Sequence, residues 1–523
     1  MIHITLTLLA VAGLTVAQVP GVWNPDRGDG TFTNPVIYAD YSDPDAVRVG
    51  DDYFMVSSSF SAVPGLPILH SRDLVNWDLV NHALPRLVPE SVFSTPRHGA
   101  GVWAPAIRHH AGRYWIYYPD PDHGIYVITA TDPRGRWSGP VLVKAGKGLI
   151  DPCPLWDDDG SVYVIHAFAR SRAGFANVLH LNRLTPDGMR VADEGRVVIN
   201  GDTIPGYTTL EGPKFYKRNG WYYVFAPAGG VKQGWQSVFR ARRIDGPYED
   251  RIVLEQGSTD INGPHQGALV DTPRGEWWFL HFQDAEAYGR VVHMQPVVWK
   301  DDWPVIGHDP EGDGRGEPRR SWKQPSLPAW KPVVPPTSDT FESRIGRQWQ
   351  WQANPQREWA SIDTRGLRLT AVPSASSLWH APNLLMQKFP APQFTATVTL
   401  DTSGLLVGER AGLIVFGASY AWIGVERTDG ARRIVLRVVD DAANATMEKD
   451  VASVEAPTGS LSLRVSVGAG GVCTFSVGSR TLGPLFIAKP GRWVGAKVGL
   501  FAAAPEGSRQ TGHVTVRSFL VSR

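Results

Sequence analysis

The stretch GVWAPAIRHHAGRYWIYY, residues 101–118, contains the unit from which most of the chain is built. A short Pro-containing segment, WAPAI, which we call the tag, precedes a short run of residues. A polar turn with Gly112 and an aromatic-rich run that starts at Tyr114 follow. Glycine supplies the positive φ that a tight turn needs, and Tyr, Trp, Phe and Val favour strands. The stretch therefore predicts a two-stranded β-hairpin preceded by a fixed tag.

Four further segments repeat this pattern along the first two thirds of the chain. They are VRVGDDYFMVSSS from Val47, LWDDDGSVYVIHA from Leu155, FYKRNGWYYVFA from Phe215 and LVDTPRGEWWFLHF from Leu269. The five tags begin at residues 43, 103, 151, 211 and 263. A period of roughly 50 to 60 residues is the length of a four-stranded propeller blade with generous loops. We therefore expect a five-bladed β-propeller.

A second domain is predicted after a proline-rich segment. Residues 322–338 read WKQPSLPAWKPVVPPTS, and such prolines favour an extended linker over a central strand. Beyond it, the alternating runs at 394–400, 433–439 and 513–521 are typical of half-buried strands in a β-sandwich. The expected chain is all-β, with a signal peptide at 1–17, the propeller at 18–321, the linker at 322–337 and the sandwich at 338–523.

The N-terminal sequence indicates where the protein is located, and the net charge indicates which classes of partner it does not bind. An apolar stretch from Ile4 to Val16 precedes small residues, which favours a cleaved signal peptide and a secreted or periplasmic protein; a buried first strand is the alternative. The stretch is too short to span a membrane. A net charge of +1 without a polybasic run argues against nucleic acid and anionic membranes as partners. We expect an uncharged substrate.

Three of the five tags carry a carboxylate at the same place: Asp43, Asp151 and Glu211. The innermost strands of a propeller surround its axis, so these side chains are expected to meet in one pocket. Hydrolysis of a glycosidic bond needs a proton donor and a second carboxylate, and a separation of roughly 6.5–9.5 Å leaves room for water and inverts the anomeric centre. We expect Glu211 to be the acid, Asp43 the base and Asp151 the group that tunes the acid. The alternative is that these tags only make turns.

The repeated segments, together with NPVIYADYSDPDAV, IDPCPLWDDDG, LEGPKFYK and GPHQGAL, resemble glycoside hydrolase family 43. This family comprises inverting β-xylosidases and α-L-arabinofuranosidases on five-bladed propellers, and the likeness covers about residues 34 to 310. It implies the same three carboxylate roles. The part from Asp339 resembles the jelly-roll, concanavalin-like sandwich of the β-xylosidase branch. The implied activity is exo-hydrolysis of terminal β-D-xylosyl or α-L-arabinofuranosyl residues of hemicellulose oligosaccharides.

The resemblance also implies four substrate-binding residues: Trp103, Ile150, His265 and Arg290. Trp103 offers a flat face for a sugar ring, and Arg290 offers several donors to a sugar hydroxyl and to Asp43 or Asp151. Ile150 stands where the family often has an aromatic residue, so the choice of terminal sugar stays open. His265 implies a structural calcium ion at the propeller centre, whereas the residues alone favour a hydrogen-bonded core histidine. No organic cofactor is expected.

Three other functions are compatible with parts of the sequence. One is a β-galactosidase or galactanase-type exo-hydrolase of the same fold. Another is a non-catalytic carbohydrate-binding propeller with a lectin-like sandwich, for which three carboxylates in register are not required. A retaining fructan hydrolase is the third, and its usual Asn-Asp-Pro-Asn and Glu-Cys motifs are missing from the sequence.

Overall fold

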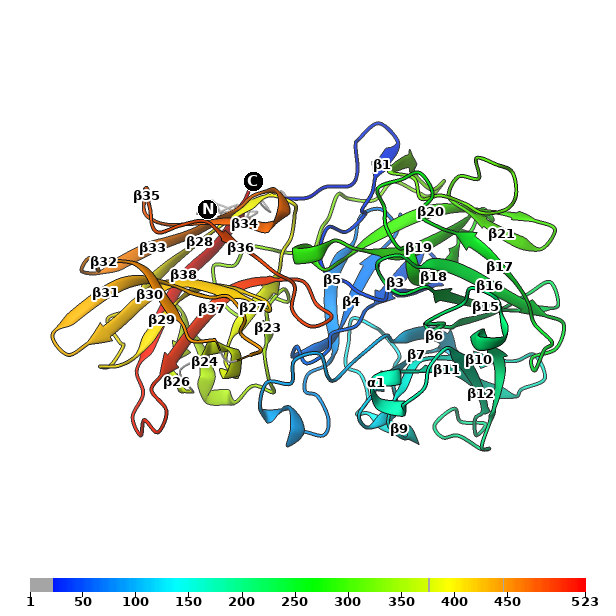
Figure 1. Cartoon of the computed structure of the whole chain (residues 1–523), viewed down its shortest axis with the longest axis horizontal. Coiled ribbons are helices and arrows are strands. Elements are labelled where there is room, and N and C mark those ends of the chain that lie inside the picture. The colour runs from blue at the N-terminus through cyan, green and yellow to red at the C-terminus, as the bar shows by residue number, and fades with distance from the viewer. Residues whose placement is uncertain (1–21, 375–376, 445) are drawn as a thin grey trace, which may run out of the picture.

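The computed structural model describes residues 22–374, 377–444 and 446–523, and these form two β domains placed side by side (Figure 1). The predicted signal peptide, residues 1–17, lies outside the described residues. A single short α-helix, α1 (Arg170–Ala173), occurs within these ranges. None of their helices has the length and apolar character needed to cross a membrane. The predicted all-β fold class is confirmed.

The propeller consists of five four-stranded antiparallel sheets, each formed by consecutive strands. Blade 1 has β2 (Asp45–Val49), β3 (Asp52–Val56), β4 (Gly65–Ser71) and β5 (Asp78–Leu84), and blade 2 has β6 (Ala106–His110), β7 (Arg113–Asp120), β8 (Gly124–Ala130) and β9 (Val141–Ala145). Blade 3 has β10 (Leu149–Trp156), β11 (Val162–Phe168), β12 (Val178–Arg183) and β13 (Arg196–Asn200). Blade 4 has β14 (Lys214–Arg218), β15 (Trp221–Ala228), β16 (Trp235–Ala241) and β17 (Glu249–Leu254), and blade 5 has β18 (His265–Asp271), β19 (Trp277–Asp284), β20 (Arg290–Lys300) and β21 (Trp303–Ile306).

The first strand of each blade is the innermost one. Contacts join β18 to β2, β2 to β6, β6 to β10 and β10 to β14, so these strands form an inner ring. Each predicted hairpin falls on the first two strands of a blade, as in the pairing of β6 with β7. The tags therefore all lie at the same end of the inner ring, where the sequence repeat placed them.

The first and last segments of the propeller chain are joined by polar contacts and by a small sheet. Strand β1 (Thr31–Thr33) pairs with β22 (Ser321–Lys323). The Asn34 side chain donates to the carbonyls of Met294 and Arg319, at 2.9 and 2.7 Å. Because β22 belongs to this closure, the boundary predicted after residue 321 falls inside a strand, and the propeller side of the molecule extends to Lys323.

The second domain is a sandwich of two mainly antiparallel sheets. One contains β23 (Gln350–Trp351), β27 (Leu385–Lys388), β37 (Lys497–Ala504), β29 (Arg410–Phe416), β30 (Tyr420–Thr428), β31 (Ala431–Val439) and β32 (Lys449–Glu455), with β26 (Val372–Pro373) beside β37. The other contains β24 (Ala360–Asp363), β25 (Gly366–Thr370), β38 (His513–Ser522), β28 (Phe394–Asp401), β33 (Ser460–Val467), β34 (Val472–Val477) and β35 (Arg480–Thr481), with β36 (Phe486–Ile487) beside β34. Along β28, buried and half-buried residues alternate, as the sequence pattern predicts.

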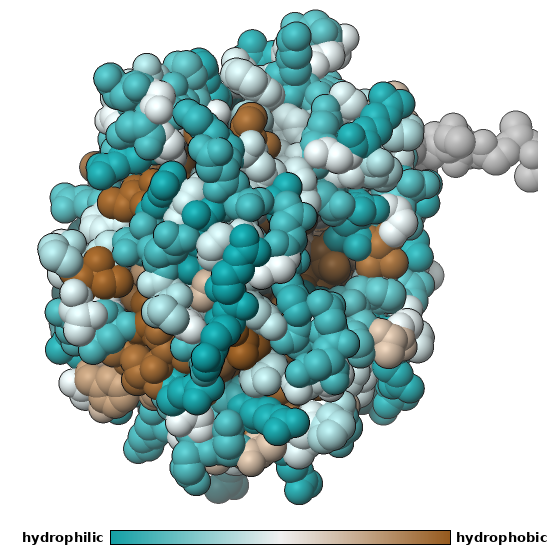
Figure 2. All heavy atoms as spheres, turned by 90° about the vertical axis from the view of Figure 1, so that its right-hand side faces the viewer, coloured by the Kyte–Doolittle hydropathy of each residue, from teal (hydrophilic) through white to brown (hydrophobic). Residues whose placement is uncertain are grey.

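The sandwich is packed firmly against the propeller. Phe93 and Val63 of the propeller belong to the same buried apolar cluster as Trp351 of the sandwich. The Asn354 side chain makes two hydrogen bonds with the backbone of Leu87, at 2.8 and 2.9 Å. The opposite end of the propeller faces away from this interface, and polar side chains cover most of it (Figure 2). The two domains thus share one hydrophobic core along their interface.

Candidate active site

A pocket of about 440 Å³ opens at the tag end of the inner ring. Every blade contributes to its wall, and so does a loop of the sandwich. Six of the residues proposed from the sequence line it, together with five others: Asp43, Trp103, Ile150, Asp151, Glu211 and Arg290, with Phe60, Ala104, Val231, Gln266 and Trp493. His265 is the one proposed site residue outside this lining.

The backbone of two tags is bent so that an aspartate enters the pocket. Asp43 and Asp151 have φ values of 54° and 57°, in the left-handed region, and each precedes a proline. Aspartate tolerates this conformation better than most residues, although it still costs roughly 1 kcal/mol or more. The ladder between β10 and β11 shifts register between Ile150 and Cys153, so Asp151 lies in a β-bulge. Local strain of this kind is typical of functional sites.

The Asp43 carboxylate is held by three buried donors. Arg290 Nη1 lies 3.1 Å from Oδ1 and 3.2 Å from Oδ2. The hydroxyls of Ser42 and Ser58 donate to Oδ2 at 2.7 and 2.5 Å. Hydrogen bonds to an ionised carboxylate are shorter and stronger than those between neutral groups. Of the two partners proposed for Arg290, Asp43 is the one that the structure brings to it.

The other two carboxyl groups have strongly raised pKa values. Burial, with a further contribution from the charge of Asp43, raises the pKa of Asp151 to about 7, against a hydrogen bond of 2.8 Å from the Gly212 amide. Burial and then the neighbouring Asp151 raise the pKa of Glu211 to about 8. About a quarter of the Glu211 side chain stays accessible (24%), and its carboxyl lines the pocket. Glu211 is therefore protonated at neutral pH and available as a proton donor.

His265 lies beside Glu211 and does not fit a calcium site. Its Nε2 is 3.7 Å from Glu211 Oε1, and burial lowers its pKa to about 3. Within residues 22–374, 377–444 and 446–523, neither ring nitrogen has a hydrogen-bond partner. Calcium takes six to eight oxygen ligands. Among the described residues there is no group of three or more His, Cys, Asp or Glu side chains that could hold a metal ion. A neutral imidazole with one carboxyl nearby does not supply the oxygen ligands that calcium prefers.

Buried charged residues fill the inner ring next to the pocket. Arg108 Nη1 lies 2.6 Å from Asp45 Oδ2, and Arg108 Nη2 lies 2.9 Å from the sulfur of Cys153. The sequence shows no basic residue close to Cys153, yet the fold supplies one from the neighbouring blade. Burial nevertheless raises the pKa of the Cys153 thiol, with Arg108 acting against the rise. The thiol is therefore unreactive at neutral pH.

Trp493 is a pocket residue that the sequence did not reveal. It lies in the sandwich loop before β37, and its ring centroid is 5.9 Å from that of Trp103. The Arg290 guanidinium is also 5.9 Å from the Trp493 ring. The only signal in the sequence is an isolated tryptophan in the Gly-rich segment KPGRWVG. Nothing in that segment indicates that it reaches the propeller.

One buried carboxylate ties this loop to Arg290. Asp40 Oδ1 accepts a hydrogen bond from the backbone amide of Arg290, and Oδ2 accepts one from the amide of Gly495, both at 2.9 Å. The backbones meet so closely that a Cβ on Gly289 would lie 2.7 Å from the Gly495 nitrogen. Asp40 therefore joins the segment that holds Asp43 to the loop that carries Trp493.

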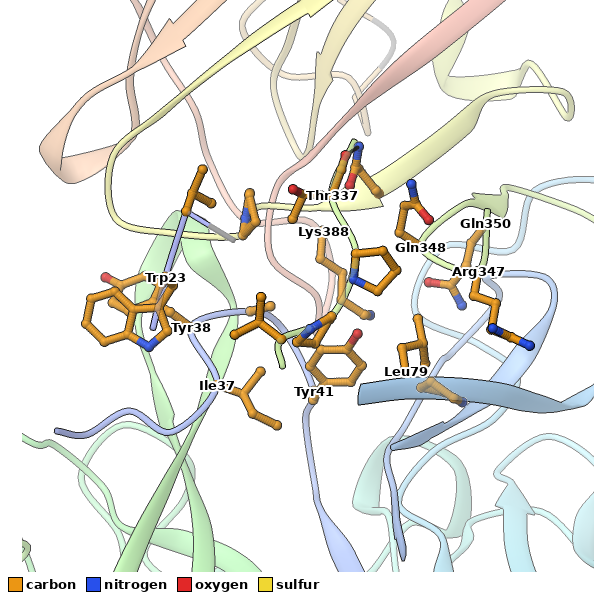
Figure 3. A pocket seen from close by; sticks show the side chains of 18 of the residues that line it. Trp23, Ile37, Tyr38, Tyr41, Leu79, Thr337, Arg347, Gln348, Gln350 and Lys388 are labelled. Carbon is orange, nitrogen blue, oxygen red and sulfur yellow. Dashed lines mark hydrogen bonds between the residues drawn. The ribbon is translucent and has the colours of Figure 1, made fainter. Parts of the chain in front are cut away.

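A second cavity, of about 600 Å³, lies at the interface between the domains (Figure 3). Trp23, Tyr38 and Tyr41 of the propeller, together with Gln348 and Lys388 of the sandwich, surround it. The Lys388 amine sits 5.1 Å from the centre of the Tyr41 ring. None of the three candidate catalytic carboxylates lines this cavity, so it is a separate feature of the interface.

Comparison with known proteins agrees with the geometry. Residues 32–304 match the glycosyl hydrolases family 43, and residues 338–522 match the beta xylosidase C-terminal concanavalin A-like domain. A putative beta-xylosidase of Xylanibacter ruminicola is 43% identical over 402 residues, which is 76% of this chain and 73% of that protein. The non-reducing end alpha-L-arabinofuranosidase BoGH43B of Bacteroides ovatus is 29% identical over 76% of each chain.

A solved structure of similar form is that of a bifunctional GH43-CE protein of Bacteroides eggerthii. It has a TM-score of 0.82 and 30% sequence identity, and the match covers 94% of this chain and 63% of that longer one. The predicted propeller, sandwich and family resemblance are thereby confirmed. The chain is a glycoside hydrolase and belongs to glycosyl hydrolases family 43.

Proposed function

We propose that the protein is an inverting exo-glycosidase that removes terminal β-D-xylosyl or α-L-arabinofuranosyl residues from hemicellulose oligosaccharides. The observation that carries this proposal is the unequal environment of three carboxyl groups in one pocket. Asp43 is bound to a guanidinium, whereas Asp151 and Glu211 have pKa values raised to about 7 and 8. Acetal hydrolysis requires a proton donor and a second carboxyl group in a different environment.

In this mechanism Glu211 is the general acid and Asp43 the general base. Glu211 gives its proton to the glycosidic oxygen as the bond from that oxygen to the anomeric carbon breaks. Asp43 takes a proton from a water molecule whose oxygen forms the new bond to the anomeric carbon on the opposite face. The product carries the inverted configuration, and exchange with solvent restores both carboxyl groups.

Asp151 and Arg290 support these two groups. The negative charge of Asp151 disfavours ionisation of Glu211 and so keeps the acid protonated. Arg290 fixes the orientation of Asp43 through its Nη1. Trp103 offers an apolar face to the C–H surface of the sugar, and the guanidinium of Arg172 lies 5.5 Å from this ring.

The shape of the pocket supports attack at chain ends. Residues of all five blades wall the pocket, and Trp493 adds a wall from the sandwich side. The relatives named as a beta-xylosidase and an alpha-L-arabinofuranosidase support the two sugars proposed here.

The test is a panel of aryl β-D-xylopyranoside, α-L-arabinofuranoside and β-D-galactopyranoside substrates. Turnover of either of the first two is expected, and NMR of the first product should show the inverted anomer. Exclusive turnover of the galactoside would replace the substrate assignment. Initial release of the retained anomer would contradict Asp43 acting on water.

We also propose that the protein is exported, on the basis of the apolar stretch from Ile4 to Val16. Fractionation of expressing cells, with N-terminal sequencing of the mature protein, tests this. An uncleaved N-terminus in the cytoplasmic fraction would contradict it.

A further inference from the structure

The fifth blade places a side chain in the pocket by the same backbone device as blades 1 and 3. Gln266 follows His265 at the start of β18 and has a φ of 39°, in the same left-handed region as Asp43 and Asp151. The ladder between β18 and β19 pairs His265 with Phe282 and Gly267 with His281, so Gln266 has no partner opposite and forms a β-bulge. A bulge redirects a side chain away from the alternation of its strand.

The redirected side chain lies against the backbone of the proposed acid. A Cβ on Gly212 would come within 2.8 Å of Gln266 Cδ, so the glutamine packs on the residue that directly follows Glu211. Gln266 is only 3% exposed and lines the pocket together with the three carboxyl groups. Its amide is therefore close to the backbone of the proposed acid and shielded from bulk water.

The amide nitrogen of Gln266 is buried and has no hydrogen-bond partner among the residues that the structure describes. A buried donor left without a partner is costly, and native proteins retain few of them. Gln295 in the same blade shows the usual arrangement: its oxygen accepts from the Arg319 amide at 2.7 Å, and its nitrogen lies 3.3 Å from His281 Nε2. Gln266 differs because its unpaired donor borders a pocket that is wide enough for a sugar.

We propose that the side-chain amide of Gln266 donates a hydrogen bond to one hydroxyl group of the sugar bound in the pocket, and that it is a specificity-determining residue. This inference rests on the proposed function. A neutral amide at this position binds a hydroxyl without adding a third negative charge beside Glu211, which a carboxylate there would do. A site built to pair with a hydroxyl discriminates strongly against substrates that lack it.

The test compares wild type with Gln266→Leu on a hydrolysed aryl glycoside and on its singly deoxygenated analogues. We expect kcat/KM of the variant to fall about tenfold on the parent glycoside. On the one analogue that lacks the recognised hydroxyl, wild type and variant should have equal kcat/KM. Leucine tolerates the backbone here, since Leu66 and Leu74 adopt φ values of 53° and 67° in this fold.

Two outcomes would overturn the inference: kcat/KM of the variant falls by the same factor on every analogue, or it does not fall on the parent glycoside. A displaced basic limb of the pH profile in Gln266→Leu would instead mean that the residue acts through Glu211, which also contradicts direct contact with substrate. The matched control is Gln295→Leu, which should lower thermal stability without changing the ratio between parent and analogue. If Gln266→Leu does not fold, Gln266→Met serves in its place.

The inference fails separately from the proposed function. Wild type that hydrolyses no glycoside in the panel removes the proposed function. Calorimetry with the free sugars and their deoxy analogues then tests Gln266 without turnover. Wild type and Gln266→Leu should bind the analogue that lacks the recognised hydroxyl with equal affinity. If wild type hydrolyses a glycoside and Gln266→Leu has the same ratio of kcat/KM between parent and deoxy analogues as wild type, only the role of Gln266 is contradicted.

Discussion

Trp493 of the sandwich and Trp103 of the second blade meet edge to face in the wall of the pocket, with ring centroids 5.9 Å apart and planes inclined at 63°. The two residues are almost 400 positions apart and belong to different domains. Their meeting makes the catalytic pocket a joint product of the propeller and the sandwich. The accessory domain therefore contributes directly to the substrate-binding wall.

Replacement of Trp493 by alanine is expected to raise KM and lower kcat/KM about tenfold, because an aromatic wall of the sugar site is lost. Since Trp493 is 41% exposed, the free energy of unfolding should change by less than about 1 kcal/mol. Steady-state kinetics and thermal melting check both parts. Leu485→Ala, at a 66% exposed sandwich position outside the pocket lining, is the control. An unchanged KM in Trp493→Ala would show that the sandwich does not touch substrate.

Glu211→Gln should reduce kcat by roughly 10²–10⁴-fold on substrates with poor leaving groups, because no proton reaches the departing oxygen. The loss should shrink as the aryl leaving group becomes more acidic. Asp43→Asn should be severely impaired with every leaving group, because activation of the water molecule does not depend on how acidic the leaving group is. Rates across a series of substituted aryl glycosides distinguish the two. The same leaving-group dependence in both variants would contradict the assignment of acid and base.

The pH profile of kcat/KM should fall as pH rises through about 8, because Glu211 must be protonated to act. Asp151→Asn removes a neighbouring negative charge, so ionisation of Glu211 becomes easier and its pKa falls. The basic limb of the variant should therefore move to lower pH. Profiles of wild type and variant on one aryl glycoside provide the measurement, and an upward displacement would refute the role given to Asp151.

The same raised pKa values predict how stability depends on pH. A carboxyl group whose pKa is higher in the folded state contributes stability that is complete below the unfolded pKa of about 4. For Asp151 and Glu211 that contribution is lost as pH rises through about 7 and 8. Asp151→Asn should therefore gain stability relative to wild type between pH 5 and pH 9. Urea unfolding at several pH values tests this, and a constant difference would count against it.

Asp40→Asn should weaken both the domain interface and the active site. The amide has a single acceptor oxygen, so one of the bonds to the amides of Arg290 and Gly495 is lost. The expected cost is about 1–3 kcal/mol in the free energy of unfolding, with a lower kcat/KM. The control is Asp132→Asn, whose surface pairing with Arg134 contributes under about 1 kcal/mol. Wild-type kinetics in Asp40→Asn would show that Arg290 does not depend on this contact.

Much of the architecture was readable from local pattern. Hairpins with a glycine turn and aromatic strands repeat at a fixed spacing, and period-two alternation marks strands such as Phe394–Asp401. The tags fall at the start of the inner strands, so the repeat predicts that Asp43, Asp151 and Glu211 line one pocket, as they do in the structure. The linker boundary was less accurate, because the pairing of Ser321–Lys323 with Thr31–Thr33 joins residues 290 positions apart.

Contacts between distant segments were decided only by the tertiary structure. The sequence contains Trp493, Asp40 and Arg108, but not the fact that they lie against Trp103, Gly495 and Cys153. The same limit applies to Gln266, because its entry into the pocket depends on a β-bulge between His265 and Gly267 that the local pattern does not show. Repeats and alternation are properties of short segments, and the chain itself carries them. Which side chains meet depends on how blades and domains pack, and packing is determined by the whole fold at once.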